Sequence, residues 1–483
     1  MSGELPAGWT HFSLKSLGGL SGGKTPSKAN SDFWSSSDVP WVSPKDMKKD
    51  LLNDSEDKIS QTAMDKAGMV LYQTGSVLMV TRSGILQHTF PVALTGADMT
   101  VNQDIKVLRP NEGISPKLSF YMLKSFGQEI LSACAKGGTT VQSIDTEKLE
   151  AFPLPLPPSA EQTRIAQKLD ELLAQVDTLK ARIDAIPALL KRFRQSVLAA
   201  AVSGRLTADW RAENTRIDLS AQINKILSDR SLSSKSKKVP ASHLTNEEYE
   251  IPDTWRWVSL DSLAAKIVDG THHTPTYMDH GVPFISVKDI RYGVIDFTNT
   301  KFITTEEHAE LCKRCHPEKG DLLITKSGTI GRTAIIPRTI EFSLFVSVAL
   351  IKPASMLVNM HFINIALMKW VDGIDVSSRI VGSAIKNLHL TDMKVLAIPF
   401  APLEEQAEIV RRVEQLFAFT DQLEAKIKTA QARVNHLTQS ILAKAFRGEL
   451  VPQDPSDEPA SVLLARIQTQ RAAAPKTKRG KKP

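Results

Sequence analysis

The sequence has little cysteine and no long apolar run. Its 483 residues include three cysteines, Cys134, Cys312 and Cys315, too few for a disulfide framework in a chain of this length, which indicates a reducing cytoplasm. No uncharged apolar stretch approaches the roughly 18 residues that a membrane-spanning helix needs. The opening residues, MSGELPAGW, show no basic region followed by an apolar stretch. We therefore expect a cytoplasmic protein with neither a secretory signal nor a membrane anchor.

Sequence motifs typical of catalytic sites are also scarce. No Ser/His/Asp triad and no metal–carboxylate cluster stands out by spacing. The glycine-rich cofactor loop and the polar-Pro-Pro-aromatic motif of an amino-group methyltransferase do not occur, and the nearest string, Leu156–Ser159, has the wrong flanks. We expect a chain that has no catalytic residue and binds no cofactor.

Two short motifs match the residue patterns of known ligand-binding sites, but the residues around them do not fit such sites. Gly18-x-x-x-x-Gly23-Lys24-Thr25 matches the phosphate loop, but that loop needs an apolar helix after it, and here Pro26 and a polar stretch follow. We expect an exposed glycine-rich loop instead.

The second motif, Cys312-Lys313-Arg314-Cys315-His316, matches a haem-attachment string without an export signal to support it. A zinc site needs four ligands, so histidines such as His272, His273 or His308 would have to complete it. We expect no metal here.

Positive charge is concentrated at the end of the chain. The net charge is +7 and the pI is about 9.1. Residues 476–483 carry five lysines and arginines and no acid, so the remainder of the chain has a net charge of only +2. Such a block is usually a solvated end. Composition alone therefore does not establish binding to nucleic acid.

The chain repeats itself at a spacing of about 245 residues. Four pairs of segments show the repeat: Leu5–Trp9 with Ile251–Trp255, Val39–Met47 with Val282–Ile290, Thr81–Gly84 with Thr325–Gly328, and Gln195–Leu206 with Gln439–Leu450. Their order is kept and their spacing varies by only a few residues. The chain therefore consists of two similar halves.

Each half begins with a mixed region. Short apolar runs bounded by glycine and polar residues, such as Val77–Val80 and Leu322–Thr325, are typical of strands. The periodicity of Leu118–Ala133 and His361–Val371 predicts helices. Each mixed region is therefore expected to be a small α/β or α+β domain.

A long amphipathic helix is predicted after each mixed region. Ser159 and Gln162 form a capping-box pattern behind a proline-rich string, and Glu404 and Glu405 suit a first helical turn. Apolar residues then recur at spacings that are mostly three or four, which suits packing along one seam. The first stripe is Ile165, Leu169, Leu172, Leu173, Val176, Leu179, Ile183 and Ile186, and the second is Ile409, Val413, Leu416, Phe417, Leu423, Ile427, Val434, Leu437, Ile441 and Leu442.

Pro187 is expected to kink or break the first helix, and Gly204 and Gly448 to end the two helices. Helices of roughly 40 residues are about 60 Å long, more than a small domain needs to cover its core. They can pair with another molecule, or with each other about an internal pseudo-twofold axis; closed self-complementary arrangements are the commoner kind. We therefore predict an α+β fold in which two similar mixed domains are separated by two long antiparallel helices.

Two similar domains on a stiff spacer could contact DNA at two places a fixed distance apart. A spacer of about 60 Å can place two readers on grooves one turn apart or more, since one turn of B-DNA is roughly 34–36 Å. Because the halves have diverged between their shared segments, the two half-sites should differ.

The helical segments resemble those of a known family. Glu405–Phe417, followed by Gln439–Leu450, is similar to the C-terminal conserved region of type I restriction–modification specificity subunits, in the style of the type IA group. Leu169–Asp177 and Lys191–Gln195 resemble their central conserved region. The resemblance covers the whole domain order. It implies one target recognition domain in each half, and each domain would read one half of an asymmetric, bipartite DNA sequence.

The resemblance also implies partners. Two modification subunits would bind the helices, and restriction subunits would join that core. Adenine methylation with S-adenosylmethionine, and cleavage with ATP and Mg²⁺, would belong to those partners. The expected divisions are target recognition domain 1 (1–158), a central helix (159–210), a polar linker (211–250), target recognition domain 2 (251–402), a C-terminal helix (403–450) and a polar, basic tail (451–483).

The candidate DNA contacts are basic, hydroxyl and histidine residues in glycine-rich loops. Arginine and lysine hold phosphates or read guanine edges. The candidates are Thr25, Lys45 and Arg82 in the first half, their counterparts Thr274, Lys288 and Lys326 in the second, and His272, His273, Arg332 and Lys386 in the second half alone. The alternative for each of them is a solvated surface charge. The halves also differ after the shared Ser-Gly, where Ile85–His88 stands against Thr329–Arg332.

Two other functions stay open at this point. The chain can be a stand-alone DNA-binding or scaffold protein that dimerises through its coiled coil, and purification without modification subunits would favour that function. It can also be an enzyme built around Gly23–Thr25, which ATP binding lost on Lys24→Ala would support.

Overall fold

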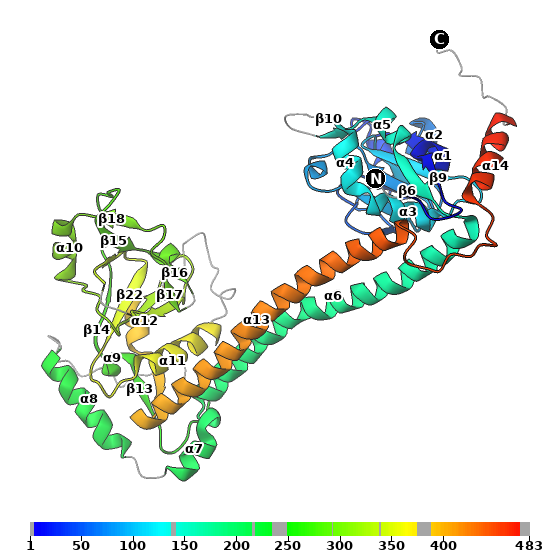
Figure 1. Cartoon of the computed structure of the whole chain (residues 1–483). Helices are drawn as coiled ribbons and strands as arrows, with labels where there is room; N and C mark the ends of the chain where they lie inside the picture. Colours follow the sequence, from blue (N-terminus) through cyan, green and yellow to red (C-terminus); the bar gives the residue numbers. More distant parts are fainter. Residues whose placement is uncertain are drawn as a thin grey trace. The chain divides into compact units, whose positions relative to one another are not determined.

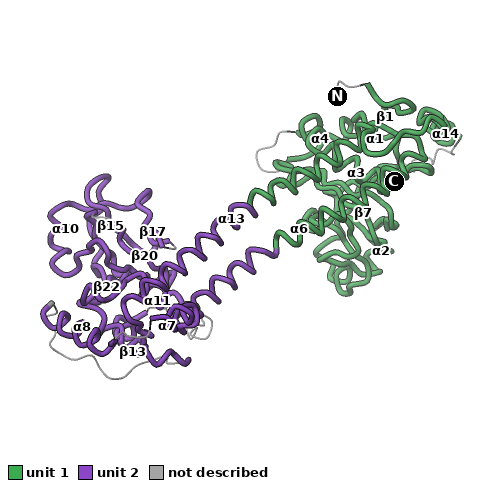
Figure 2. The backbone as a smooth tube through the Cα atoms, turned by 60° about the horizontal axis from the view of Figure 1, so that its bottom comes forward, with its two compact units in different colours: residues 1–184, 428–483 green, residues 185–427 purple. Residues whose placement is uncertain are grey.

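The chain forms two compact units. The computed structural model describes residues 4–136, 142–214, 218–233, 249–291, 293–337, 340–373 and 388–473. Unit 1 comprises residues 1–184 and 428–483, and unit 2 comprises residues 185–427 (Figure 2). Each unit therefore contains one mixed domain and a part of both long helices.

The mixed domain of unit 1 is built on a five-stranded sheet of order β2-β9-β6-β7-β4 and a three-stranded sheet of order β5-β3-β8. The strands are β1 (Thr10–Ser13), β2 (Gly18–Gly22), β3 (Val39–Val42), β4 (Leu51–Leu52), β5 (Lys58–Ile59), β6 (Val77–Val80), β7 (Val92–Thr95), β8 (Thr100–Val101), β9 (Ile105–Pro110), β10 (Ala135–Lys136), β11 (Ser143–Ile144) and β12 (Pro153–Leu156). The short helices are α1 (Leu14–Leu17), η1 (Ser31–Phe33), α2 (Gln61–Lys66), η2 (Gly84–Gln87), α3 (Pro116–Ser125), α4 (Gly127–Cys134) and α5 (Thr146–Ala151). All four residues of β6 are buried, because this strand lies at the centre of the larger sheet.

Unit 2 repeats this plan. Its four-stranded sheet has the order β14-β22-β19-β20 and its three-stranded sheet the order β18-β15-β21. The strands are β13 (Arg256–Ser259), β14 (Ala264–Asp269), β15 (Val282–Ile285), β16 (Ile290–Arg291), β17 (Val294–Ile295), β18 (Lys301–Ile303), β19 (Leu322–Thr325), β20 (Thr333–Ile335), β21 (Ser343–Leu344), β22 (Val348–Pro353) and β23 (Ala397–Phe400). The helices are η3 (Arg205–Thr207), α7 (Ala208–Glu213), α8 (Leu219–Ser233), α9 (Leu260–Leu263), η4 (Val287–Asp289), α10 (Thr305–Cys312), α11 (Met360–Gly373) and α12 (Leu390–Lys394). The α+β fold with two similar mixed domains is confirmed.

The two long helices are α6 (Ser159–Val202) and α13 (Leu403–Phe446), of 44 residues each. In each unit they lie side by side and run in opposite directions (Figure 1). In unit 1 Gln431 donates to Asp184 at 2.9 Å. In unit 2 Arg194 donates to Thr420 and Asp421 at 3.0 and 2.6 Å, and further along Arg412 donates to the carbonyl of Leu206 at 2.8 Å. The predicted antiparallel pairing within one chain is confirmed.

The ends of the long helices agree with the sequence only in part. Gly204 and Gly448 have φ of 73° and 75°, a left-handed conformation that favours glycine and stops both helices. Pro187 does not break α6, which continues through it to Val202. The predicted capping box is wrong. Gln162 accepts from the backbone N–H of Ser115 at 3.2 Å and donates to the carbonyl of Pro157 at 3.1 Å, so its side chain is engaged elsewhere.

Both long helices start with the same anchor. The indole of Trp9 donates to Glu161 at 2.8 Å, and the indole of Trp255 donates to Glu405 at 2.8 Å. All four side chains are buried. The repeated Leu/Ile-Pro-x-x-Trp motif therefore ties the start of each half to the helix that follows its mixed domain.

Three other sequence expectations need correction. The helix expected over Leu118–Ala133 is two helices, α3 and α4, which meet at Phe126. The expected linker 211–250 contains α8, because Leu219, Ile223 and Ile226 form an apolar stripe that packs on the core of unit 2. The expected polar tail contains a further helix, α14 (Ala460–Ala473), whose Leu463 and Ile467 are buried in the core of unit 1.

Helices α8 and α14 extend the internal repeat beyond the segments visible in the sequence. Arg230 of α8 donates to the carbonyl of Ala264 at 3.2 Å, at the end of α9. Arg471 of α14 donates to the carbonyl of Gly18 at 2.9 Å, at the end of the equivalent helix α1. The buried apolar residues align as well, since Leu219 and Ile226 precede Arg230 by the same spacings as Ala460 and Ile467 precede Arg471. Each long helix is thus followed by a short helix that completes a mixed domain.

Candidate DNA interface

The most concentrated set of candidate contacts lies in unit 2 around Asp269, the last residue of β14. Its buried carboxylate receives Lys326 at 2.9 Å and His272 at 3.3 Å. Arg314, which follows α10, forms a third ion pair with it. Burial by itself would raise the pKa of Asp269, but the hydrogen bond from Lys326 and the charges of Lys326, Arg314 and His272 hold that pKa below its usual value. The carboxylate of Asp269 therefore forms ion pairs with three basic side chains.

Exposure differs within this set. The side chains of Arg314 and His272 are 54% and 62% exposed, whereas that of Lys326 is 13% exposed. Arg314 and His272 are therefore open to a phosphate, while Lys326 mainly balances the buried charge of Asp269.

Neighbouring candidates lie on the same loop. His273 is exposed, contacts the hydroxyl of Thr271 at 2.7 Å and lies 3.5 Å from Glu307. Thr274 is exposed. Gly270 leaves no room for a side chain, because a Cβ there would lie 1.9 Å from the carbonyl oxygen of Leu344. The loop therefore packs against strand β21 through glycine and presents its polar residues outward.

The remaining candidates of unit 2 are more scattered. Lys288 is exposed on η4, with no hydrogen bond or ion pair to another described residue. Arg332 is half-buried, donates to the carbonyl of Ile290 at 3.3 Å, and keeps a buried Nε without a partner among the described residues. Lys386 lies outside the described residues.

The candidates of unit 1 do not form a comparable cluster. Thr25 is half-buried and donates to the side chain of Gln103. Lys45 is paired with Asp57 at 2.9 Å and Glu56 at 3.3 Å, and the hydrogen bond to Asp57 is the main cause that raises the pKa of Lys45. Arg82 is exposed. The matched pair Arg82 and Lys326 thus differs, because Lys326 has a buried acid beside it.

The phosphate-loop pattern has the wrong structure for nucleotide binding. Its residues Gly18–Gly22 form strand β2, which pairs with β9, so their backbone groups are used within a sheet. Lys24 donates to the carbonyl of Ala67 at 2.6 Å, and the helix that a phosphate loop needs does not follow.

Residues of the cysteine motif contact other side chains of the mixed domain of unit 2. Cys312 lies 3.5 Å from a ring nitrogen of His308, which contacts the hydroxyl of Ser343 at 2.9 Å. Burial lowers the pKa of His308 and raises the pKa of Cys315 to about 12. No group of three or more potential metal ligands occurs among the described residues.

Two residues of the Asp269 cluster were not among the sequence candidates. Asp269 directly precedes Gly270 in the loop that supplied His272, and Arg314 lies inside the cysteine motif. An acid inside a basic, glycine-rich loop was the available signal for Asp269. Arg314 is 45 residues away in sequence, so only the tertiary structure places it there.

Comparison with known proteins decides the family. Residues 6–188 and 252–430 each match the family model described as "Type I restriction modification DNA specificity domain". The chain belongs to this family of type I specificity subunits. The two matches correspond to the two halves of the internal repeat.

Individual specificity subunits are similar over most of the chain. The EcoBI specificity subunit of Escherichia coli is 39% identical over 350 residues, covering 69% of this chain and 68% of that protein. The EcoKI specificity subunit of Escherichia coli K12 is 32% identical over 390 residues, covering 76% of this chain and 74% of that protein.

Solved structures support the fold of this specificity subunit. A chain from a structure described as "Structural basis underlying complex assembly and conformational transition of the type I R-M system" superposes with a TM-score of 0.62 at 19% identity, over 93% of this chain and all of the other. The HsdS subunit from Thermoanaerobacter tengcongensis gives a TM-score of 0.53 at 18% identity, over 93% of this chain and 99% of its own. No helix among the described residues is long and apolar enough to cross a membrane.

Proposed function

We propose that this specificity subunit binds DNA and directs a type I restriction–modification complex to an asymmetric, bipartite sequence. The observation that carries the proposal is the duplication. The DNA specificity domain matches twice, and each match spans one mixed domain with its own loops and the first part of the long helix that follows it. Two unlike domains on one chain suit two unlike half-sites.

The loops provide the chemistry for contact with a duplex. In unit 2, Arg314 and His272 surround a carboxylate but keep most of their side chains exposed. Together with Lys288 and Thr274 they form the candidate phosphate and base contacts of this domain. In unit 1 the candidates are Arg82, Thr25 and Lys45.

The partners of this subunit follow from its family. We assign methylation to two modification subunits that dock on α6 and α13, and ATP-dependent cleavage to restriction subunits. S-adenosylmethionine, ATP and Mg²⁺ would then be bound by those partners, in the cytoplasm, while this chain binds no cofactor. Because both long helices contribute residues to both units, they are suited to set the spacing between the half-sites.

Mapping methylated adenines tests the proposal. The chain is co-expressed with modification subunits of the type I family, and methylated positions in cellular DNA are sequenced. We expect one bipartite motif with an unread gap, and replacement of residues 5–158 by those of a relative should change one half of it only. Absence of any motif, or a change in both halves together, would contradict the proposal.

Purification distinguishes this function from a stand-alone scaffold. A specificity subunit should be recovered with modification subunits and be poorly soluble without them. A soluble homodimer that binds DNA without such partners would favour the scaffold instead.

A further inference from the structure

Both mixed domains carry a pair of aromatic rings at the same place. In unit 1 the rings of Trp34 and Trp41 lie 5.3 Å apart in an edge-to-face arrangement. In unit 2 the rings of Tyr277 and Phe284 lie 6.0 Å apart. In each pair the first residue precedes the second by the same number of positions, and the second belongs to the central strand of the three-stranded sheet.

The strand register in the two three-stranded sheets shows which residues of the two domains are equivalent. In unit 2, Phe284 on β15 is paired with Lys301 on β18. In unit 1, β3 and β5 have the same antiparallel pairing, and the backbone N–H of Trp41 donates to the carbonyl of Asp57 at 3.0 Å. Asp57 and Lys301 therefore occupy the same position beside the second aromatic residue of each pair.

The aromatic pair of unit 1 lines an open groove of about 600 Å³. The groove is lined by Lys28, Ser31, Trp34, Ser35, Trp41 and Asp57. Trp41 is 6% exposed, whereas the other lining side chains are half-buried or exposed. The groove therefore combines an apolar wall with polar groups at its edge.

The equivalent position carries opposite charges in the two domains. The Asp57 carboxylate is 43% exposed and is held by Lys45 at 2.9 Å. Lys301 is exposed, and its Nζ lies 5.6 Å from the ring centre of Tyr277, which is itself 43% exposed. The shared sheet therefore does not fix the charge at this position, which leaves the charge available for recognition.

Opposite charges beside aromatic rings match the chemistry of bases. A carboxylate accepts a hydrogen bond from the amino group of cytosine, whereas lysine donates to O6 and N7 of guanine. In an intact duplex the faces of the bases are covered by their neighbours, so the Trp34 or Tyr277 ring packs against the sugars of the backbone and supplies affinity without selecting a base.

We propose that these duplicated aromatic sites are the base-contacting surfaces of the two domains, and that Asp57 and Lys301 select the base. Asp57 favours a base with an exocyclic amino group in the half-site of unit 1. Lys301 favours guanine in the half-site of unit 2. The inference rests on the proposed function and assigns its specificity to two residues.

The test is methylome sequencing of complexes that contain Asp57→Lys. We expect one base of the unit 1 half-site to change, with a preference for the new base of roughly tenfold or more, and the other half-site to stay the same. Asp54→Lys is the matched control, because Asp54 is also exposed, also pairs with a lysine and lies three positions earlier. This control should leave the motif unaltered.

Two further variants keep the result interpretable. Lys301→Asp should change one base of the other half-site only, and Trp34→Ala, which removes a backbone contact, should lower the methylation rate at the original motif by about tenfold without altering its sequence. Thermal unfolding of each complex verifies folding. An unaltered motif in folded Asp57→Lys and Lys301→Asp complexes would overturn the inference while leaving the proposed function intact. If the natural chain directed no bipartite methylation, the proposed function itself would fail.

Discussion

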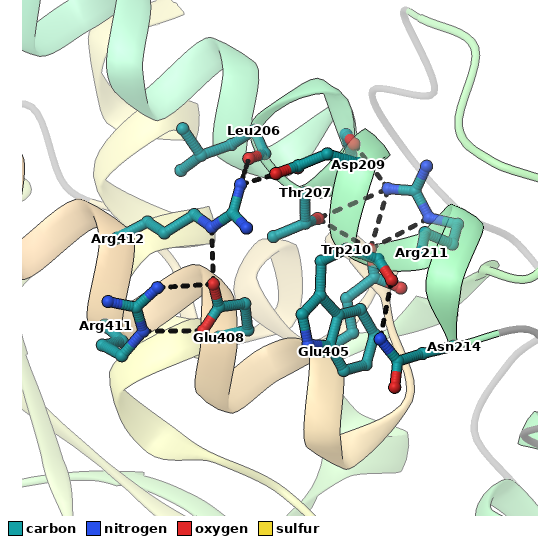
Figure 3. Close-up of polar contacts among 11 residues, drawn as sticks. Leu206, Thr207, Asp209, Trp210, Arg211, Asn214, Glu405, Glu408, Arg411 and Arg412 are labelled. Atoms are coloured by element: carbon teal, nitrogen blue, oxygen red, sulfur yellow. Dashed lines mark hydrogen bonds and ion pairs between the residues drawn. The ribbon is translucent and has the colours of Figure 1, made fainter.

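At the scale of single residues, the two anchoring glutamates have matching places but different surroundings. Glu405 accepts hydrogen bonds from Thr207 at 2.7 Å and from Arg211 at 2.8 Å (Figure 3). It also accepts the hydrogen bond from the indole of Trp255. Glu161 accepts from Trp9, while its Oε1 is buried without a partner among the described residues. The repeat therefore kept the indole–carboxylate bond, but of these two glutamates only Glu405 forms an ion pair with an arginine among the described residues.

This difference predicts unequal effects of the same substitution. Glu405→Gln leaves Arg211 without its buried anion and should destabilise unit 2 by about 3 kcal/mol. Glu161→Gln removes no ion pair and should change the stability by less than about 1 kcal/mol in either direction. Urea unfolding of both variants checks the prediction, and equal losses would contradict it.

Burial of Glu161 also predicts a pH dependence. Burial raises the pKa of Glu161, so this residue contributes stability below its ordinary pKa of about 4.5, and that contribution is lost as the pH rises through the raised value. Replacement by glutamine should remove this loss. Melting temperatures of the natural chain and of Glu161→Gln, measured from pH 4 to pH 8, should therefore diverge in favour of the variant as the pH rises.

The stability that a second glutamate, Glu408, contributes depends on pH in the opposite direction. Hydrogen bonds from Arg411 and Arg412 lower the pKa of Glu408 to about 2 (Figure 3). The stabilisation by Glu408 is therefore complete above about 4.5, its ordinary pKa, and is lost as the pH falls toward 2. Glu408→Gln should destabilise the chain by about 1 kcal/mol at pH 7, since the site is partly solvated, and by less at pH 3. A difference that grows at low pH would refute this.

At the scale of elements, α8 and α14 show why a polar composition is a poor guide to disorder. Each has a narrow apolar stripe and one arginine that binds the end of a short helix. The stripe of α14 packs beside Gly113, where a Cβ would lie 2.8 Å from Leu463. The segment after each long helix is therefore part of a domain core.

Adjacent residues of α14 test this packing. Leu463 is 6% exposed and Val462 is 43% exposed. Leu463→Ala should destabilise unit 1 by about 2 to 3 kcal/mol, because it opens a cavity in the core, whereas Val462→Ala should change stability by less than about 0.5 kcal/mol. Thermal unfolding distinguishes them; two equal and small effects would mean that α14 contributes nothing to the core.

At the scale of the whole molecule, the long helices belong to neither unit alone. The boundary of the two units falls between Asp184 and Ala185 in α6 and between Ile427 and Lys428 in α13. Inserting seven residues at both points adds about two turns and keeps the apolar seam on one face. The methylated motif should then keep its bases and gain a longer gap. A changed base, or an unchanged gap, would argue against helices that set the spacing.

Inserting the seven residues in α6 alone is the control. It displaces the part of α6 on one side of the insertion relative to α13, so the pair Arg194–Asp421 of unit 2 and the pair Gln431–Asp184 of unit 1 cannot both form while the two helices stay continuous. This variant should lose stability and methylation together.

The sequence by itself determined the duplication, the two mixed domains and the two long helices, because these depend on local periodicity and on repeated segments. Leu463 and Ile226 show its limit, since the helices that carry them form by packing against distant residues. Pro187 shows it too, because α6 continues through a residue that was expected to kink or break it.

Only the tertiary structure decided which polar residues meet. Arg314 reaches Asp269 from the turn that follows α10, and Asp57 stands where Lys301 stands in the other domain because β3 pairs with β5 as β15 pairs with β18. The local sequence pattern carries no information on such pairs. The charged side chains interact only after folding has brought them close together.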